Sequence, residues 1–216
     1  MTRLTNKVAI ITGGASGIGA ACVKYLIVKG HQVVVMDLPD PASLDPRALG
    51  FIACDVTDEA AVKASLEKIE AEYGPVNALV NSAGITGPNT KVWDYPVDEW
   101  RQVIDVNLTS TFRLCRGVLR GMMKQRKGRI INIASVGGLR AEGSLGVYNL
   151  TKAALIHLTR QLAGELGLTR VVGIAPGLVK TDFAQMLVDN YGDSLAKRLP
   201  RKRLGEPQDI ANLATF

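Results

Sequence analysis

The sequence predicts an α/β protein in which a doubly wound parallel sheet lies between two layers of helices. Six short runs of apolar, mostly β-branched residues alternate with longer segments of helical pattern. A glycine-rich turn follows the first run, and small or polar residues follow the others. Because no linker interrupts the alternation, we expect residues 1–216 to form a single domain with a three-layer α/β/α architecture.

The composition is that of an ordinary globular protein, with 47% hydrophobic and 21% charged residues. The N-terminus has no apolar signal-peptide core, and no apolar run reaches membrane-spanning length. The three cysteines are isolated, without metal-ligand spacing or a disulfide framework. We therefore expect a cytoplasmic protein that binds neither metal nor membrane. The cysteines are Cys22, Cys54 and Cys115.

The net charge of +6 is distributed unevenly. Residues 106–141 contain no acid, and residues 197–203 form a second basic cluster. A solvated basic surface is the simpler interpretation, and attraction of an anionic substrate or an acidic carrier protein is the alternative. No nucleic-acid recognition motif accompanies the charge, so we expect no nucleic-acid partner. The basic residues of the first stretch are Arg113, Arg116, Arg120, Lys124, Arg126, Lys127, Arg129 and Arg140.

The glycine-rich turn has the context of a dinucleotide-binding loop. The apolar run 7–12 leads into the glycines of residues 13–19, and a helical pattern follows through Lys29. Glycines let the backbone approach a pyrophosphate, while the helix N-terminus supplies free N–H groups and the positive end of the helix dipole. The spacing is Thr-Gly-x-x-x-Gly-x-Gly rather than G-x-G-x-x-G.

An acidic residue ends the second run and bears on the choice of coenzyme. Residues 32–36 form this run, and Asp37 follows it about twenty residues after the glycine turn. A carboxylate at this point can accept hydrogen bonds from an adenosine ribose and would repel the 2′-phosphate of NADP. Ser16, at the third variable position of the turn, offers no compensating positive charge. The sequence therefore favours NAD over NADP.

The remaining elements follow from periodicity and from start and stop signals. The Pro/Asp-rich connector 39–49 leaves little room for a helix. Thr57-Asp58 supplies an N-cap, and Gly74-Pro75 stops the helix that it begins. We expect further strands at 50–54, 77–80, 129–134 and 170–175, and helices at 59–73, about 97–125, 148–166 and after 205–207.

A tyrosine and a lysine lie four residues apart on the helix expected over 148–166. Residues at this spacing share a helix face, which brings Tyr148 and Lys152 close together. A phenol has an ordinary pKa of about 10, and a cation about 4 Å away at an effective dielectric near 20 can lower it by roughly three units. A tyrosine tuned in this way can take a proton from an alcohol or return one to a carbonyl.

Taken together, these residues resemble the short-chain dehydrogenase/reductase family, which has a Rossmann-like fold. The resemblance runs from about Asn6 to the last residue, and it lies in the order and spacing of several short motifs. These are Thr12–Gly19, Asp55-Val56, Asn81–Gly84, Asn107, Ser135, Tyr148 with Lys152, and Pro176-Gly177.

The resemblance implies a catalytic tetrad. Tyr148 would be the acid/base, and Lys152 would lower its pKa and hold the nicotinamide ribose. Ser135 would hydrogen-bond the substrate oxygen, and Asn107 would hold a water that relays protons to Lys152. The cofactor positions implied in the same way are Gly13, Ser16, Gly17, Ile18, Gly19, Asp37, Asp55, Val56, Asn81, Ala83, Gly84, Tyr148, Lys152, Pro176, Gly177, Val179 and Thr181.

The function implied is NAD(H)-dependent interconversion of a secondary alcohol and a ketone on a small substrate. A 3-oxoacyl-[acyl-carrier-protein] reductase is the alternative among enzymes, although Asp37 counts against it because such reductases usually use NADPH. A catalytically idle NAD-binding regulatory protein is the alternative from another class. Residues 137–146 and 181–202 are expected to shape the substrate pocket.

The sequence departs from the family pattern at two places, and the resemblance also implies an oligomer. Residues 167–169 form a shorter connection before the sixth strand than relatives have. The chain ends within an expected helix, whereas relatives continue into a seventh strand, so the sixth strand would be a sheet edge. Family members commonly form homo-oligomers, tetramers or dimers, through the helices expected at about 108–125 and 148–166.

Overall fold

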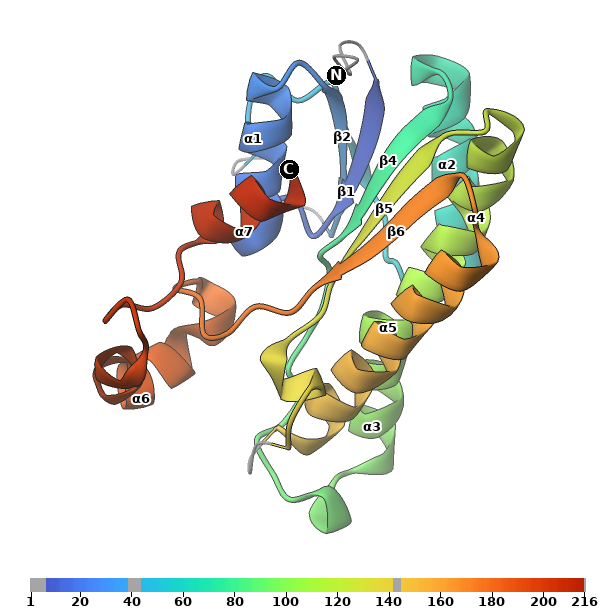
Figure 1. The fold of residues 1–216 in the computed structure, drawn as a ribbon. Helices are drawn as coiled ribbons and strands as arrows, with labels where there is room; N and C mark the ends of the chain where they lie inside the picture. The colour runs from blue at the N-terminus through green and yellow to red at the C-terminus, as the bar shows by residue number, and fades with distance from the viewer. Residues whose placement is uncertain (1–6, 39–43, 142–144, 216) are drawn as a thin grey trace.

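A computed structural model describes residues 7–38, 44–141 and 145–215. The first six residues, part of the 39–49 connector and residues 142–144 of one expected pocket segment lie outside the described residues. Within the described residues, six strands form one parallel sheet in the order β3-β2-β1-β4-β5-β6 (Figure 1). The strands are β1 Val8–Thr12, β2 Gln32–Asp37, β3 Gly50–Ala53, β4 Val76–Asn81, β5 Gly128–Ile133 and β6 Thr169–Ile174.

The central strands are apolar on both faces because helices cover both sides of the sheet. In β1, Val8 and Ile10 point into one core, whereas Ala9 and Ile11 point into the other. All four side chains are buried. A strand buried on both faces has a continuous apolar sequence rather than an alternating one, which is why the parallel sheet could be predicted.

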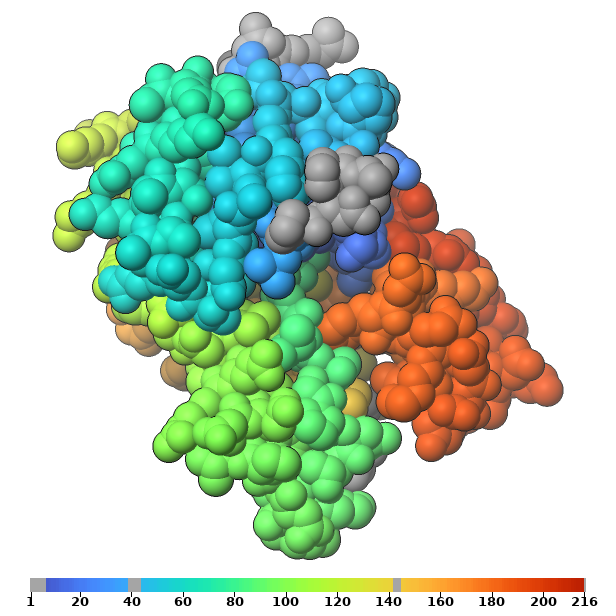
Figure 2. Space-filling view, turned by 180° about the vertical axis from the view of Figure 1, so that it is seen from behind, coloured from blue at the N-terminus to red at the C-terminus, as the bar shows by residue number. Residues whose placement is uncertain are grey.

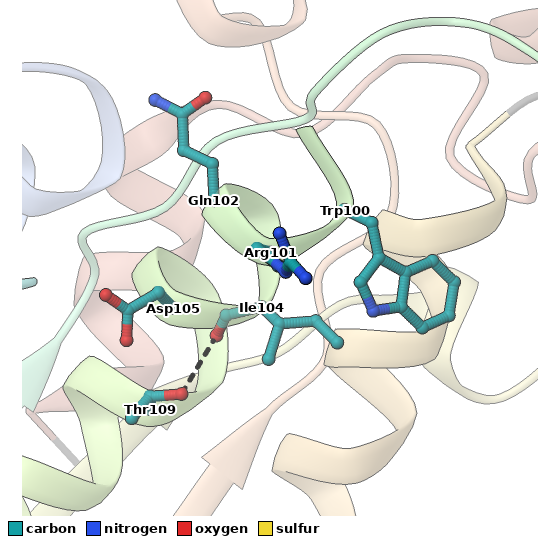
Figure 3. A pocket seen from close by; sticks show the side chains of 6 residues that line it. All are labelled: Trp100, Arg101, Gln102, Ile104, Asp105 and Thr109. Carbon is teal, nitrogen blue, oxygen red and sulfur yellow. Dashed lines mark hydrogen bonds between the residues drawn. The ribbon is translucent and has the colours of Figure 1, made fainter. Parts of the chain in front are cut away.

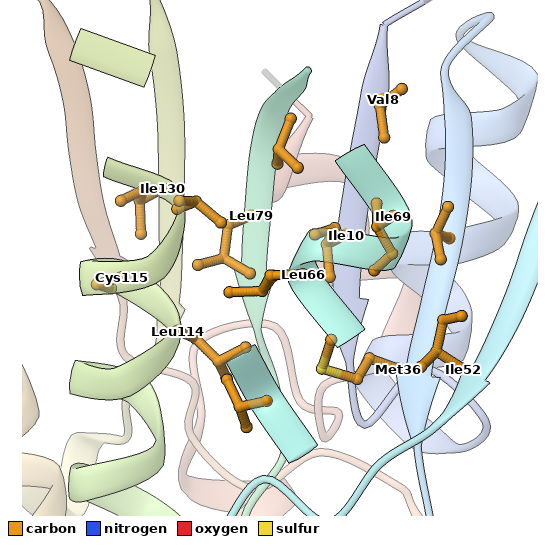
Figure 4. Packing of buried hydrophobic residues seen from close by; sticks show 14 of the residues in the cluster. Val8, Ile10, Met36, Ile52, Leu66, Ile69, Leu79, Leu114, Cys115 and Ile130 are labelled. Atoms are coloured by element: carbon orange, nitrogen blue, oxygen red, sulfur yellow. The ribbon is translucent and has the colours of Figure 1, made fainter. Parts of the chain in front are cut away.

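In the part of the chain that the structure describes, two helices cover one face of the sheet and three cover the other (Figure 1). Side chains such as Leu66, Ile69 and Leu114 fill the core beneath the three-helix layer (Figure 4). The predicted doubly wound, three-layer architecture is confirmed. The two-helix layer contains α1 Gly17–Val28 and α7 Pro207–Ala214, and the three-helix layer contains α2 Glu59–Tyr73, α4 Ser110–Lys124 and α5 Gly146–Glu165.

The predicted cap of α2 is present. The Asp58 carboxylate accepts hydrogen bonds from the backbone N–H groups of Ala60 and Ala61, at 2.8 and 3.0 Å. These groups have no partner inside the helix, and such a cap stabilises a helix by about 1 kcal/mol. At the other end Gly74 has a φ of 87°, a left-handed conformation that glycine adopts readily.

The helix expected over 97–125 is not continuous. It consists of α3 Val97–Ile104, a π-helical turn η3 Asp105–Thr109, and α4. The backbone N–H of Ser110 donates to the carbonyl of Asp105, the i→i+5 bond that defines this wide turn. Asn107 lies inside the turn, so the turn determines where its side chain points.

A long excursion leaves the sheet after β6 and carries α6 Gln185–Arg198, an element that was not predicted (Figure 1). Its two ends meet, because Val179 and Gly205 form an isolated parallel bridge. The Lys180 N–H donates to Gly205 O at 2.9 Å, and the Gly205 N–H donates to Leu178 O at 3.0 Å. A hollow separates this orange segment from the green α3–α4 region (Figure 2).

Two further expectations concern β6 and the connections. The link between α5 and β6 is short, as expected, since α5 ends at Glu165 and β6 begins at Thr169. In the described sheet β6 pairs only with β5 and leaves Arg170 and Val172 exposed.

Residues 44–49 of the connector before β3 form turns and no helix, as expected. Among the described residues, no helix combines the length and apolarity needed to cross a bilayer.

Candidate active site

The glycine turn lies at the carboxyl end of β1 and is packed too tightly for side chains. Gly13 has a φ of 64°, and a Cβ on it would lie 2.8 Å from the backbone N of Ala83. A Cβ on Gly19 would lie 1.9 Å from Gly13 O. Glycine at 13 therefore lets the turn pack against the loop after β4, and glycine at 19 lets the first turn of α1 pack against Gly13. At the N-terminus of α1 no side chain caps the helix, and Ser16 is exposed.

A threonine hydroxyl joins the loops that follow β1 and β4. Thr12 Oγ1 accepts hydrogen bonds from the backbone N–H groups of Ser82 and Ala83, at 3.2 and 3.3 Å. β1 and β4 are the neighbours at which the strand order reverses, the usual position of a ligand crevice in open α/β sheets. Thr12 belongs to the glycine motif of the sequence, but its bridging role is not predicted by that motif.

Asp37 ends β2 beside the glycine turn. Its Oδ2 accepts a hydrogen bond from the Ala15 N–H at 2.8 Å, and its Oδ1 accepts one from the Leu38 N–H at 2.8 Å. Both bonds fix the orientation of the carboxylate. The carboxylate therefore lies where the glycine turn and the end of β2 meet, as the ribose contact proposed for Asp37 requires.

The side chains at the other positions expected around the adenine and the middle of the cofactor differ in orientation and burial. Asp55 Oδ1 accepts from both the N–H and the hydroxyl of Thr57, at 2.9 and 2.7 Å, and so closes the turn before α2. Val56 is buried. The Asn81 amide points into the core, where it donates to Asn132 Oδ1 at 2.9 Å. A cofactor contact from Asn81 would therefore use its backbone.

The π turn is supported by three consecutive hydroxyl side chains. The Thr109 hydroxyl donates to Ile104 O at 3.5 Å (Figure 3), and those of Ser110 and Thr111 donate to the carbonyls of Val106 and Asn107. A wide turn leaves such carbonyls without the partners of a regular helix, and Ser and Thr side chains can replace those partners. The hydroxyl triplet explains why this sequence accommodates the π turn.

The wide turn directs Asn107 toward the loop after β4 and toward α5. Its side-chain NH2 donates to Ile85 O at 2.8 Å and to Thr151 Oγ1 at 3.1 Å, and its Oδ1 accepts from the Ile85 N–H at 2.8 Å. The Thr151 hydroxyl donates in turn to Tyr148 O at 2.7 Å. Asn107 is buried and fully oriented, and it connects the β4 loop to the helix that carries Tyr148.

Lys152 is buried on α5, close to the tyrosine ring. Its Nζ donates to Ile133 O at 2.9 Å and lies 5.5 Å from the centroid of the Tyr148 ring. Burial lowers the pKa of Lys152 to about 8, because a charge removed from water is disfavoured. A Cβ on Gly84 would lie 3.2 Å from Asn107 Oδ1 and 3.7 Å from Lys152 Nζ, so both groups flank this glycine.

Ser135 follows β5 and begins the short 3-10 helix η4 Val136–Gly138. Its hydroxyl oxygen accepts a hydrogen bond from the Gly137 N–H at 3.1 Å. A Cβ on Gly138 would lie 2.5 Å from the backbone carbon of Lys152, so η4 packs directly on the backbone of α5. This packing places Ser135 on the same side of the sheet edge as the lysine and the tyrosine.

The segment after β6 closes the opposite side of the site. The Val136 N–H donates to Pro176 O at 2.9 Å, which joins the loops after β5 and β6. Val179 is buried, and a Cβ on Gly17 would lie 3.3 Å from Thr181 Cγ2. The Phe183 ring lies 6.1 Å from that of Tyr148 at an angle of 49°. Thr181 thus faces the glycine turn and Phe183 faces the tyrosine.

Ion pairs account for part of the basic stretch, and burial accounts for the cysteines. Arg113 and Arg116 of the acid-free stretch pair with Glu59 on α2, and Arg113 also pairs with Asp105, so two carboxylates balance these two positive charges. The cysteines are free and buried, and burial raises the pKa of Cys22 and of Cys115 to about 12. Among the described residues, no cluster of three or more His, Cys, Asp and Glu side chains is suited to a metal ion.

Comparisons with known proteins agree with this geometry. A family model described as short chain dehydrogenase matches residues 7–192. A 3-oxoacyl-[acyl-carrier-protein] reductase FabG of Escherichia coli (strain K12) is 38% identical, with 97% of this chain and 88% of the relative covered. An aldohexose dehydrogenase from Thermoplasma acidophilum has a TM-score of 0.90 at 30% identity, covering 99% of this chain and 87% of that one. An NAD+-bound xylitol dehydrogenase has a TM-score of 0.92 at 27% identity, covering 100% and 93%.

Proposed function

The chain belongs to the short-chain dehydrogenase/reductase family, and on this premise we propose that it interconverts a secondary alcohol and a ketone with NAD(H) as coenzyme. The family is one of NAD(P)-dependent oxidoreductases that act on small molecules. The observation that carries the proposal is the pair on α5. Lys152 is buried and hydrogen-bonded to Ile133 O, with its Nζ 5.5 Å from the Tyr148 ring centroid.

In the proposed mechanism the coenzyme, when bound, supplies the hydride chemistry, and the protein supplies orientation and proton transfer. In the oxidative direction Tyr148 takes the hydroxyl proton of the alcohol, and in the reductive direction it returns a proton to the carbonyl oxygen. The positive charge of Lys152 favours the phenolate. Ser135 donates a hydrogen bond to the substrate oxygen, and Asn107 holds the proton relay that ends at Lys152.

The residues around the glycine turn fit a dinucleotide. Gly13 and Gly19 let the turn pack tightly against Ala83 and against the start of α1, and the N-terminus of α1, which has no side-chain cap, offers N–H groups to a pyrophosphate. The phosphate contacts are proposed for Gly13, Ser16, Gly17, Ile18 and Gly19. Contacts along the remainder of the cofactor are proposed for Asp37, Asp55, Val56, Asn81, Ala83, Gly84, Pro176, Gly177, Val179 and Thr181.

The preference for NAD(H) rests on Asp37. Both carboxylate oxygens accept backbone hydrogen bonds, which holds a negative charge at the end of β2. A 2′-phosphate at that position would meet like-charge repulsion without a nearby cation on the glycine turn. The NAD+-bound xylitol dehydrogenase, whose fold this chain shares at a TM-score of 0.92, supports the same choice.

We also propose that the protein forms a homo-oligomer through α4 and α5. Phe112 and Met123 on α4 and Leu150 on α5 are 47%, 58% and 49% exposed. Large apolar side chains on neighbouring helices are a common feature of subunit interfaces. Size-exclusion chromatography with light scattering would measure the assembly, and a monomer at micromolar concentration would contradict this proposal.

The first experiment is to titrate NADH and NADPH separately against the protein and to follow nicotinamide fluorescence. We expect tighter binding of NADH, followed by turnover of secondary alcohols with NAD+. Tyr148→Phe should abolish turnover while NADH still binds, because the proton-transferring hydroxyl is lost and the other cofactor contacts remain. Tyr73→Phe, on α2 and remote from the site, is the matched control. Unchanged turnover in Tyr148→Phe would refute the mechanism.

A 3-oxoacyl-[acyl-carrier-protein] reductase is the second candidate, favoured by the 38% identity to the Escherichia coli protein of that name. Its acidic carrier would be attracted to the exposed basic side chains that follow Arg116, which are Arg120, Lys124, Arg126 and Lys127. In that case the reductase efficiency should fall as salt is raised, because exposed charges are screened. Preference for NADPH together with this salt dependence would favour the carrier reductase over the alcohol dehydrogenase.

A further inference from the structure

An ion pair joins the π turn to α4. Arg113 on α4 donates from Nη1 to Asp105 Oδ1 at 2.8 Å, and Asp105 is the first residue of the turn. The Arg113 side chain is only 16% exposed, and its Nε also lies 3.9 Å from Glu59 Oε2. A semi-buried arginine between two carboxylates is held more firmly than a surface ion pair.

The spacing of this pair depends on the register of the helix. In a regular α-helix each residue advances by about 100°, so residues eight apart point about 80° away from each other. A π turn accommodates one extra residue, so the same eight residues behave like seven and return to within about 20° of one face. Asp105 and Arg113 can therefore face each other in the π register, whereas a regular helix would separate them.

The register of the turn also sets the direction of Asn107. The Asn107 side chain makes three hydrogen bonds, to Ile85 N, Ile85 O and Thr151 Oγ1, and all three need the side chain to point toward the β4 loop and α5. Removing the extra residue from the turn would rotate the downstream helix relative to Asn107 by roughly 100°. Asn107 and the Asp105–Arg113 pair thus depend on the same wide turn.

We propose that the Asp105–Arg113 ion pair locks the π register of η3 and that Arg113 is thereby a positioning residue for Asn107. The pair acts through the backbone of the turn, because Arg113 binds the carboxylate of Asp105, the first residue of η3. Its kinetic consequence rests on the proposed dehydrogenase function. Its structural consequence, the orientation of Asn107 against Ile85, does not.

The test compares two arginines on the same helix. Arg113→Met breaks the pair with Asp105, whereas Arg116→Met removes an arginine that pairs with Glu59 and lies over the Phe112 ring, without touching the turn. Hydrogen exchange of the Ile85 amide reports on Asn107 directly, because that N–H donates to Asn107 Oδ1. We expect exchange at Ile85 to be at least tenfold faster in Arg113→Met and unchanged within twofold in Arg116→Met.

Kinetics provide the second readout. In Arg113→Met, kcat should fall at least fivefold while the Kd for NADH changes less than twofold, because the proton relay and not the cofactor site is disturbed. Arg113→Lys should restore most of kcat, and Asp105→Asn should reproduce the defect from the other partner. Asp105→Asn is isosteric and keeps the test decisive if Arg113→Met does not fold.

The exchange and kinetic measurements separate a failure of the register lock from a failure of the proposed function. Equal Ile85 exchange in the Arg113→Met and Arg116→Met variants would overturn the register lock, as would equal losses of kcat and NADH affinity in Arg113→Met. If the wild-type protein oxidises no secondary alcohol, the proposed function fails on its own. The Ile85 exchange rates then still decide whether Arg113 holds the turn.

Discussion

Replacing Lys152 with methionine should make the protein more stable at neutral pH while removing its activity. The ammonium group is buried, and burial lowers its pKa from 10.5 to about 8. At 1.36 kcal/mol per pKa unit, the buried charge costs about 3 kcal/mol of folding free energy. Loss of the Nζ hydrogen bond to Ile133 O offsets about 1 kcal/mol of the gain. Lys152→Met should therefore raise the free energy of unfolding by about 2 kcal/mol, or the Tm by about 4–8 °C.

The advantage of the variant should depend on pH in a defined window. Below pH 8 the lysine is protonated in both the folded and the unfolded chain, so the full cost is present. Between about pH 8 and 10.5 the folded protein has released the proton while the unfolded chain still binds it. Unfolding then takes up a proton, so wild-type stability rises with pH relative to the variant. Other titrations are common to both proteins and cancel in the comparison.

Urea unfolding at pH 7 and pH 10, followed by circular dichroism, measures both effects. Lys124→Met is the control, because Lys124 is exposed at the end of α4 and should show no pH-dependent gain. Turnover by Lys152→Met should be lost, since the charge that favours phenolate is gone. A variant that is less stable than wild type at pH 7, or one whose advantage is the same at pH 10, would refute the assigned cost of burial.

Two smaller predictions address the glycine turn and the α2 cap. Gly13→Ala puts a methyl group 2.8 Å from Ala83 N at a φ of 64°, so the Kd for NADH should rise at least tenfold in a fluorescence titration. Gly164→Ala has no atom within 4 Å to meet and should leave that Kd unchanged; equal effects would contradict the packing argument. Asp58→Ala should lower the free energy of unfolding by about 1 kcal/mol in urea and leave kcat within twofold. Unaltered stability would show that the cap contributes nothing.

The sheet and its order of elements could be predicted because burial dominates them. Strands covered on both faces require uninterrupted apolar residues, and the observed bounds of β2 and β5 differ from the expected ones by one residue. The N-cap at Asp58 and the glycine at 74 set the limits of α2 through local backbone chemistry, which is encoded nearby in the sequence.

The π turn and its contacts could not be predicted from periodicity. One wide turn shifts the hydrophobic pattern of residues 97–125 by a single residue, too little to separate it from a regular helix. The hydroxyl run Thr109-Ser110-Thr111 is a local signal that could have suggested it. The inward direction of Asn81 depends on Asn132 from another strand, a long-range contact that no local pattern specifies.

The bridge between Val179 and Gly205 makes the α6 excursion a closed loop outside the sheet. The chain enters and leaves this loop at one place, where Leu178 and Lys180 form hydrogen bonds with Gly205. Because loop-closure entropy grows slowly with length, residues within the excursion can be inserted or exchanged at small cost to the layers beneath. Phe183, which faces the tyrosine ring, lies within it. On the proposed mechanism, substitutions in this segment would change the surroundings of Tyr148 without altering the Tyr148 and Lys152 side chains themselves.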